Sequence, residues 1–339
     1  MPSLDALVCT EPGSLRIERR EAVRRAPDHA LVRPRRIGIC GTDFHIFEGK
    51  HPFLAYPRVM GHEIACEVVE APAGSGLRPG EICVINPYIT CGTCIACRNG
   101  KPNCCATISV LGVHRDGGMA GLLSLPAGNL LPGDDLSVDQ CASVEFLAIG
   151  AHAVRRGGVG PNDRALVVGA GPIGIGTALF ARLAGAAVTL VDIDQQRLER
   201  AATIAGATCP PAGIPMTEAV AEATNAEGFD VVFDATGNRA SIEAGFAHVA
   251  QGGRYVLVSV VKEAITFSDP DFHRREMSLL GSRNATELDF RRVMSVMRAG
   301  DVAMDALITH RTTLTEAVKD FPRWARDKTG LIKALITNE

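Results

Sequence analysis

The sequence lacks the features that mark a membrane protein or a binder of polyanions. Its 339 residues carry 35 basic and 38 acidic side chains, and the formal net charge of -3 offers no basic surface to nucleic acid or to anionic lipid. The uncharged stretch 165–181 contains four glycines and a proline, unlike a membrane-spanning helix. The first twenty residues do not have the pattern of a signal peptide, because they contain the acidic Asp5 and no long apolar run. We therefore expect a cytoplasmic protein with a small-molecule ligand and with no nucleic-acid or membrane partner.

Aromatic residues are also scarce, and disulfide pairing is not expected. The chain has one Trp and three Tyr, so an aromatic-lined hydrophobic cleft is not expected. The eleven cysteines are odd in number and follow no secretion signal, which argues against a disulfide framework. Reduced cysteines serve as metal ligands or as small core residues, and their spacing distinguishes the two uses.

Patterns along the chain predict an α/β protein with two domains, as its length favours. Residues 1–148 are rich in Gly, Pro, Cys and His between short apolar runs, which is typical of a β-rich domain with functional loops. Residues 149–281 alternate apolar strands such as RALVVG with helical patterns, which indicates a doubly wound parallel sheet. Residues 282–339 are too few for a core of their own and are expected to complete the first domain.

A glycine motif predicts a dinucleotide site in the second domain. Gly169, Gly171 and Gly174 form G-x-G-x-x-G after a strand, and Pro172 and Ile173 open the helix that follows. Such glycines let a pyrophosphate approach the backbone, and the helix N-terminus offers it free N–H groups. Another nucleotide bound by the same kind of turn is the alternative.

An acidic residue at the end of the next strand favours NAD over NADP. Asp192 lies eighteen residues after Gly174, where a carboxylate accepts hydrogen bonds from the adenosine ribose and repels a 2′-phosphate. Arg197 is nearby and weakens this preference slightly.

Two further groups of residues indicate metal binding. The first, at about 90–106, has the spacing of a closed tetrahedral Zn²⁺ site, with an iron–sulfur cluster or a nucleic-acid zinc ribbon as alternatives. The second could be an ordinary buried Cys and His, or an open Zn²⁺ site that activates an alcohol. The first group is Cys91, Cys94, Cys97 and either Cys104 or Cys105, and the second is Cys40, His62 and Glu63.

The motifs together resemble the zinc-containing medium-chain dehydrogenase/reductase family, in its polyol or sorbitol-dehydrogenase-like branch. GICGTD, GHE, the four-cysteine loop, VEFLAIGAHAV, VVGAGPIG and VDID occur in that family's order and cover essentially the whole chain. The resemblance implies a GroES-like catalytic domain, 1–148 with 282–339, and a Rossmann NAD-binding domain, 149–281. It also implies one catalytic and one structural zinc, NAD as coenzyme, and a homodimer or homotetramer.

The resemblance assigns roles to individual residues. Cys40 and His62 match the first two catalytic zinc ligands. Glu145 matches the third, and Glu63 matches a residue that binds zinc directly or by exchange, so the choice between these two glutamates stays open. Cys105 matches the fourth structural ligand. Thr42 matches the hydroxyl that contacts the substrate oxygen, and His45 matches the imidazole that passes the proton to solvent. Asp43 matches the carboxylate that orients His62, and Lys333 matches a basic residue near Glu63 and the pyrophosphate. For Lys333 a solvated cation at a strand end is the alternative.

The segment after the last Rossmann strand bears on the substrate. The resemblance places Val258, Ser282 and Asn284 at the nicotinamide, and it points Arg283 toward the substrate. A guanidinium there suits a carboxylate or several hydroxyls, while a subunit contact is the alternative. His114 and Phe53 are further candidates for the pocket.

GSRNAT and GVHRDGG are similar to sugar-acid dehydrogenases of the L-galactonate and L-gulonate 5-dehydrogenase type. We therefore expect NAD-linked oxidation of a secondary alcohol on an aldonate or polyol. Oxidation of sorbitol or threonine is the first alternative, and a non-catalytic NAD- and zinc-binding protein is the second.

Overall fold

The computed structural model describes residues 3–21, 23–51 and 54–338, and the chain divides into two compact units. The first unit comprises the described residues up to Glu145 and those from Thr286 onward, and the second runs from Phe146 to Ala285. These boundaries lie three or four residues from the expected ones. Helix α3 (Val138–Gly157) continues unbroken through the first of them.

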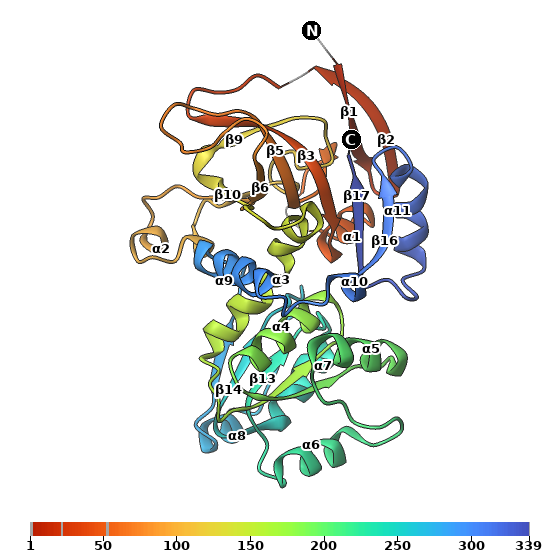
Figure 1. The fold of residues 1–339 in the computed structure, drawn as a ribbon. Helices are drawn as coiled ribbons and strands as arrows, with labels where there is room; N and C mark the ends of the chain where they lie inside the picture. The colour runs from red at the N-terminus through yellow and green to blue at the C-terminus, as the bar shows by residue number, and fades with distance from the viewer. Residues whose placement is uncertain (1–2, 22, 52–53, 339) are drawn as a thin grey trace. The chain divides into compact units, whose positions relative to one another are not determined.

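The first unit is built mostly of antiparallel strands, and only β16 and β17 pair in parallel among its described strands (Figure 1). Its largest sheet has the order β10-β6-β5-β3-β17-β16, with β9 paired to β3, and a smaller sheet has the order β2-β1-β4. A third pair joins β7 and β8. The strands are β1 (Ser3–Glu11), β2 (Ser14–Glu21), β3 (His29–Ile39), β4 (Arg58–Val59), β5 (Glu63–Glu70), β6 (Ile82–Ile85), β7 (Tyr88–Ile89), β8 (Ser109–Val110), β9 (Leu123–Pro126), β10 (Leu130–Pro132), β16 (Ile308–Thr313) and β17 (Lys333–Thr337).

The C-terminal strand β17 lies beside β3 in the middle of this sheet. It pairs antiparallel with β3, so Ala334 stands opposite Ile39. Helices cover the sheet and fill its connections: α1 (Gly41–Phe47), α2 (Ile95–Arg98), η1 (Pro102–Cys104), η2 (Ala127–Asn129), α9 (Glu287–Arg298), α10 (Met304–Leu307) and α11 (Ala317–Arg326). The pairing brings Lys333, the first residue of β17, next to the end of β3, just before Cys40.

An aromatic cluster fixes the short helix α1 in this unit. The rings of Phe44 and Phe321 have centroids 4.8 Å apart, and Phe47 contacts Phe321 edge-on at 5.4 Å. All three side chains are buried, so α1 is held against α11 by apolar packing. A seven-residue helix needs such support, because isolated short helices are marginal in water.

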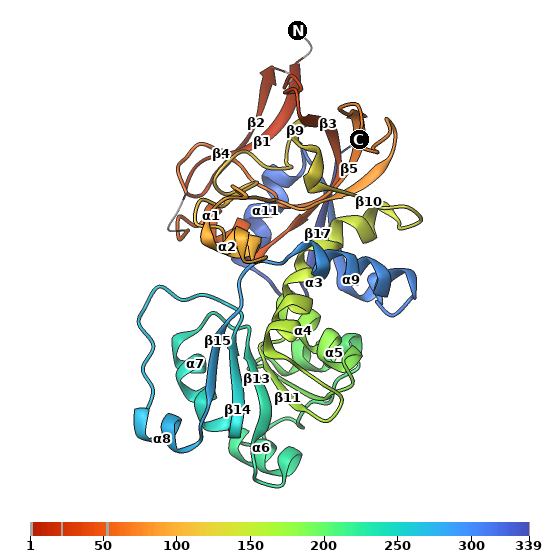
Figure 2. The same ribbon diagram turned by 90° about the vertical axis from the view of Figure 1, so that its left-hand side faces the viewer.

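The second unit is a parallel five-stranded sheet with the order β12-β11-β13-β14-β15. Its crossovers leave β11 in opposite directions, and right-handed crossovers then put helices on both faces. Figure 2 shows α4 and α5 along one side of the sheet and α7 along the other. The elements are β11 (Arg164–Val168), α4 (Pro172–Leu183), β12 (Ala187–Val191), α5 (Gln195–Ala205), α6 (Met216–Thr224), β13 (Phe229–Asp234), α7 (Arg239–Gly245), η3 (Phe246–His248), β14 (Val249–Leu257), α8 (Asp269–Arg274) and β15 (Ser278–Gly281).

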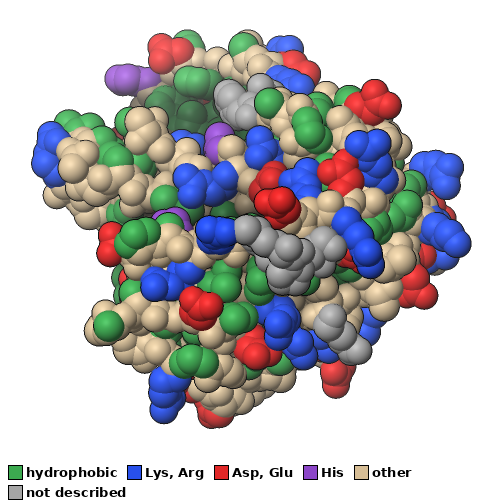
Figure 3. Space-filling view, turned by 90° about the horizontal axis from the view of Figure 1, so that it is seen from above, with side chains coloured by type: hydrophobic (Ala, Val, Ile, Leu, Met, Phe, Trp, Pro, Cys, Tyr) green, Lys and Arg blue, Asp and Glu red, His purple; other side chains and the backbone are tan. Residues whose placement is uncertain are grey.

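Basic and acidic side chains are interspersed on the face seen in Figure 3. Within the part of the chain that the structure describes, no helix has both the length and the apolar character needed to cross a bilayer.

Candidate functional site

Three of the predicted ligands come together where two antiparallel strands meet. Cys40 follows the end of β3, while His62 and Glu63 stand at the start of β5, which pairs with β3 so that Gly38 lies opposite Glu63. One ligand atom from each of Cys40, His62 and Glu63 lies within 4.8 Å of the others. His62 and Glu63 are buried and Cys40 is half-buried. We call these three residues the donor group.

A buried carboxylate joins the two segments that carry the donor group. Asp43 accepts a hydrogen bond from the backbone N–H of Cys40 at 2.9 Å and another from Gly61 at 3.2 Å. Its Oδ1 also lies 3.8 Å from Nδ1 of His62. Asp43 thus ties the start of α1 to the start of β5, and its role in orienting His62 stays a prediction.

Lys333 neutralises one of the two candidate glutamates. It stands at the start of β17, and its Nζ donates to both carboxylate oxygens of Glu63 at 2.7 Å and to the Ile39 carbonyl at 3.3 Å. Burial alone would lower the pKa of Lys333, but Glu63 and Cys40 raise it, so the side chain is a cation. A solvated cation at a strand end, the alternative weighed above, is therefore wrong, because Lys333 is only 1% exposed.

A glycine makes room for this pair. A Cβ atom at Gly38 would lie 1.9 Å from Oε2 of Glu63, so any side chain there would displace the carboxylate. The glycine of GICGTD therefore has a packing role in addition to the ligand that follows it.

The other glutamate has a neutral partner. Glu145 lies in α3 and is buried, and the Tyr88 hydroxyl donates a hydrogen bond to its Oε1. Burial and the charge of Glu145 raise the pKa of Tyr88 well above its usual value, so the hydroxyl stays protonated and remains a donor. Glu145 lies outside the donor group, although its charge acts on His62.

The electrostatics of the donor group suit a metal cation. Burial lowers the pKa of His62, yet Asp43, Cys40 and Glu145 outweigh burial and raise it well above the usual value, so the site favours positive charge at its centre. A thiolate, an imidazole and carboxylates form a donor set that suits Zn²⁺. The residues therefore fit the expected metal.

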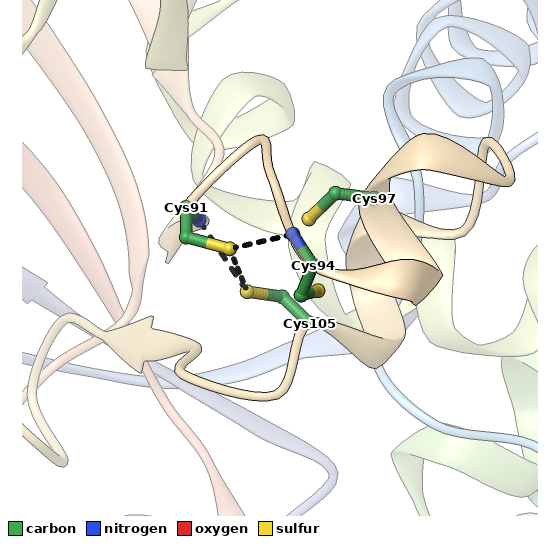
Figure 4. A group of neighbouring side chains, drawn as sticks. All are labelled: Cys91, Cys94, Cys97 and Cys105. Atoms are coloured by element: carbon green, nitrogen blue, oxygen red, sulfur yellow. Dashed lines mark hydrogen bonds between the residues drawn. The ribbon is translucent and has the colours of Figure 1, made fainter.

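The second predicted metal group is also assembled. Cys91, Cys94, Cys97 and Cys105 each offer a sulfur within 4.8 Å of the others (Figure 4). The Sγ atoms of Cys91 and Cys105 are 3.5 Å apart. The group contains Cys105 rather than Cys104, which is exposed at the end of η1.

Backbone donors prepare at least one of these sulfurs as a thiolate. The N–H groups of Thr93 and Cys94 donate to Cys91 and lower its pKa to about 5. A similar donation from Ala106 lowers the pKa of Cys94. Thiolates are the form that binds zinc, and four clustered sulfurs, two of them with a lowered pKa, fit a closed structural site.

The glycine motif forms the predicted turn from β11 into α4. Gly169 has φ +102°, and a Cβ at Gly174 would lie 1.7 Å from the Gly169 carbonyl oxygen. A Cβ at Gly171 would meet no atom within 4 Å, so this glycine borders open space at the N-terminus of α4. Pro172 is the first helical residue and Ile173 follows it. Two glycines therefore permit close packing, and Gly171 leaves the backbone accessible to a ligand.

Asp192 connects this turn to the end of β12. Its carboxylate accepts from Ala170 N–H at 2.7 Å, from Asp194 N–H at 2.9 Å and from Arg197 at 2.7 Å. Burial raises the pKa of Asp192, but these hydrogen bonds outweigh burial and hold it below the usual value. The carboxylate is thus ionised beside the glycine turn, where a ribose is expected, and Arg197 reduces its net charge.

Comparison with known proteins identifies the family. Residues 26–135 match the alcohol dehydrogenase GroES-like domain, and residues 172–299 match the zinc-binding dehydrogenase model. L-Galactonate-5-dehydrogenase of Escherichia coli (strain K12) is 38% identical over 346 residues, which cover 99% of this chain and 100% of that protein. The chain belongs to the zinc-binding dehydrogenase family. L-Idonate 5-dehydrogenase of Vitis vinifera is 32% identical over 306 residues, covering 86% of this dehydrogenase and 82% of the relative.

A solved structure supports the same assignment. The crystal structure of a short chain alcohol dehydrogenase from Escherichia coli CFT073, complexed with NADH, matches this dehydrogenase with a TM-score of 0.92 at 28% identity over 99% of each chain. The predicted α/β fold, with a GroES-like domain and a Rossmann sheet, is confirmed. The dehydrogenase is an NAD-dependent enzyme that uses zinc.

The remaining predicted residues are distributed over both units. In the first unit, half-buried Thr42 and exposed His45 lie on α1, and exposed His114 accepts a hydrogen bond at Nδ1 from Val110 N–H at 3.1 Å. Phe53 lies outside the described residues. The roles of these side chains stay predictions.

Four predicted residues lie near the end of the Rossmann sheet. Ser282 N–H donates to the Leu257 carbonyl at 2.9 Å, and its buried hydroxyl has no hydrogen-bond partner in the described chain. Val258 N–H donates to the Asp234 carbonyl at 2.9 Å, and Asn284 has a φ of +54°. Arg283 is exposed.

The tyrosine that contacts Glu145 was not predicted, because Tyr88 belongs to no motif and its partner is 57 residues away.

Proposed function

We propose that this dehydrogenase oxidises a secondary alcohol of a sugar acid or polyol to the ketone, with NAD⁺ as the coenzyme. The observation that carries the proposal is the donor group of Cys40, His62 and Glu63, in which His62 and Glu63 are buried. The relatives named L-galactonate-5-dehydrogenase and L-idonate 5-dehydrogenase support a sugar acid as the substrate.

The chemistry divides between bound cofactors and side chains. When bound, zinc supplies a Lewis acid that lowers the pKa of the alcohol, and NAD⁺ supplies the hydride acceptor. The alcohol must also lose a proton, and we assign this transfer to the Thr42 hydroxyl and the exposed His45 imidazole on α1. Apolar packing of α1 against Phe321 keeps both groups in place.

We propose that Glu145, rather than Glu63, is the third protein ligand of the catalytic zinc. Glu63 is nearer to Cys40 and His62, but Lys333 engages both of its oxygens and offsets its charge. The Tyr88 hydroxyl binds only Oε1 of Glu145 and adds no positive charge. The second oxygen of Glu145 therefore receives no hydrogen bond from Tyr88 and can bind the metal, and Glu63 serves as a reserve ligand.

We also propose that Arg283 binds the substrate carboxylate. Its planar guanidinium suits bidentate recognition of a carboxylate, and its exposure in the second unit makes it accessible to a ligand. Neutral polyols would then react more slowly than aldonates.

NADH formation over a panel of aldonates and polyols tests both the oxidation of a secondary alcohol and the carboxylate role of Arg283. We expect turnover of aldonates, and we expect Arg283→Ala to reduce it by about tenfold or more while sorbitol turnover is kept. Arg291→Ala, at an exposed position of helix α9, is the matched control. Turnover of sorbitol alone would exclude the carboxylate role of Arg283. No turnover of any secondary alcohol, with two zinc ions bound, would favour a non-catalytic NAD- and zinc-binding protein.

Assembly and location are further parts of the proposal. We propose a homodimer or homotetramer formed through the edges of the Rossmann sheet, where β15 is a terminal strand. Light scattering of the purified protein measures the mass of the assembly. None of the eleven cysteines, all of which the structure describes, is paired in a disulfide, which supports a reducing compartment such as the cytoplasm.

A further inference from the structure

A hollow of about 760 Å³ in the first unit lies apart from both metal groups. Strands β1, β2, β3, β16 and β17 and the segment that leads into α11 all contribute to its lining. Three guanidinium groups converge on it from three different strands, those of Arg19, Arg33 and Arg311. The three arginines are separated in the sequence, so the fold of the unit rather than a run of basic residues brings them together.

Three arginines and two carboxylates, those of Asp5 and Glu316, line the hollow, and among the residues that the structure describes not all of them are paired. Arg19 lies 3.7 Å from Asp5, and Arg311 donates to Asp139 at 2.6 Å. Arg33 is exposed and has neither an ion pair nor a side-chain hydrogen bond within the described residues. Glu316 also lines the hollow, where its carboxylate accepts a hydrogen bond from Thr313 at 3.0 Å. One guanidinium is therefore available to a ligand.

Hydroxyl groups add neutral donors to this charge. Thr315 and Thr337 line the hollow, and their side chains make no hydrogen bond inside the described part of the protein. Hydroxyls beside a guanidinium are typical partners of carboxylate and phosphate oxygens.

The hollow is separate from the donor group. Thr337 stands four residues beyond Lys333 on β17, and Arg33 stands seven residues before Cys40 along β3. At about 3.3 Å per residue, these spacings correspond to roughly 13 Å and 23 Å along the two strands. A ligand in the hollow cannot touch the catalytic donors, although the same two strands carry both sites.

We propose that this hollow binds a small anion through its carboxylate or phosphate group. Arg33 supplies the unpaired charge, Arg19 and Arg311 supply further guanidinium donors, and Thr315 supplies a hydroxyl. The volume suits a small metabolite rather than a macromolecule. The site is additional to the proposed substrate site.

Calorimetric titration of the full-length, zinc-loaded protein tests the proposal. Inorganic phosphate is the first probe, with saturating NAD⁺ present so that the pyrophosphate site is filled. Gluconate without NAD⁺ is the second probe, and sorbitol is the neutral control. We expect saturable anion binding that Arg33→Gln and Arg19→Gln each weaken by about tenfold or more and that added salt weakens. Arg78→Gln, which removes an exposed arginine paired with Glu81, should leave binding unchanged.

The two probes also separate the sources of the anion. Binding of phosphate that depends on Arg33 supports a phosphate ligand, and binding of gluconate that depends on Arg33 supports a carboxylate ligand. Gluconate binding that survives Arg33→Gln belongs to the substrate site. If neither anion shows Arg33-dependent binding up to about 10 mM, the proposal is wrong.

Discussion

Lys333 holds Glu63 through two hydrogen bonds of 2.7 Å, and neither side chain is more than 1% exposed. Two charges removed from water this completely depend on each other, because desolvation is costly unless the pair is intact. Replacing Lys333 by Met should therefore leave Glu63 as an uncompensated buried charge and destabilise the protein by about 3–5 kcal/mol. Urea unfolding of the zinc-loaded protein measures the change.

A double variant separates the charge effect from a loss of packing. Glu63→Gln combined with Lys333→Met should be more stable than Lys333→Met alone, because the unpaired charge is gone. Lys319→Met, at an exposed position of α11, should change the free energy of unfolding by less than about 0.5 kcal/mol. Equal stability of Lys333→Met and wild type would show that the buried pair does not form.

Tyr88→Phe tests whether Glu145 is a zinc ligand. The change removes the hydroxyl that fixes Oε1 of Glu145 and leaves that buried oxygen without its donor. Loss of such a partner of a metal ligand typically weakens metal binding by about 10- to 100-fold. We expect this loss at the catalytic site, together with a shifted visible spectrum when Co²⁺ replaces the zinc.

A second buried tyrosine provides the matched control. Tyr255 donates its hydroxyl to the Ile242 carbonyl at 3.0 Å in the Rossmann unit, so Tyr255→Phe also removes one buried hydrogen bond. Its Co²⁺ spectrum should equal that of the wild type. An unchanged spectrum in Tyr88→Phe would leave Glu63 as the better candidate for the third ligand.

Neighbouring cysteines should respond differently to the same substitution. Cys105→Ser removes one of four clustered sulfurs, and we expect the zinc content to fall from two ions per chain toward one. The loop 91–105 should then become sensitive to protease, because the metal is what holds a short loop with little core of its own. Metal analysis and limited proteolysis measure both effects.

Cys104→Ser is the control for that experiment. Cys104 is exposed and lies outside the sulfur group, so its loss should keep both zinc ions. A loss of zinc in Cys104→Ser, with zinc retained in Cys105→Ser, would reverse the assignment of the fourth ligand.

Gly174→Ala should damage the coenzyme site. The added Cβ would lie 1.7 Å from the Gly169 carbonyl oxygen, so the turn must open. We expect NADH affinity, measured by fluorescence, to fall by at least about tenfold, while zinc content is kept. Gly160→Ala in the same unit meets no atom within 4 Å and should bind NADH normally.

Local spacing was enough to predict much of this protein. The four-cysteine loop spans fifteen residues, and the glycine motif lies within one turn, so both sites follow from short-range geometry. The alternation of apolar strands and helical patterns predicted the parallel sheet, because residues buried on both faces must be apolar. Predictions of this kind need no knowledge of which distant strands pair.

By itself, the sequence determined which residue types are available: thiolates at metal-binding spacing, a glycine turn before a helix, and an acid after the next strand. Tertiary structure alone decided how the two glutamates differ. Lys333 reaches Glu63 across 270 residues because β17 pairs with β3, and Tyr88 reaches Glu145 across 57 residues because both are buried together. The physical reason is that the charge and donor strength of a buried carboxylate depend on its neighbours in space, and strand pairing rather than sequence spacing selects those neighbours.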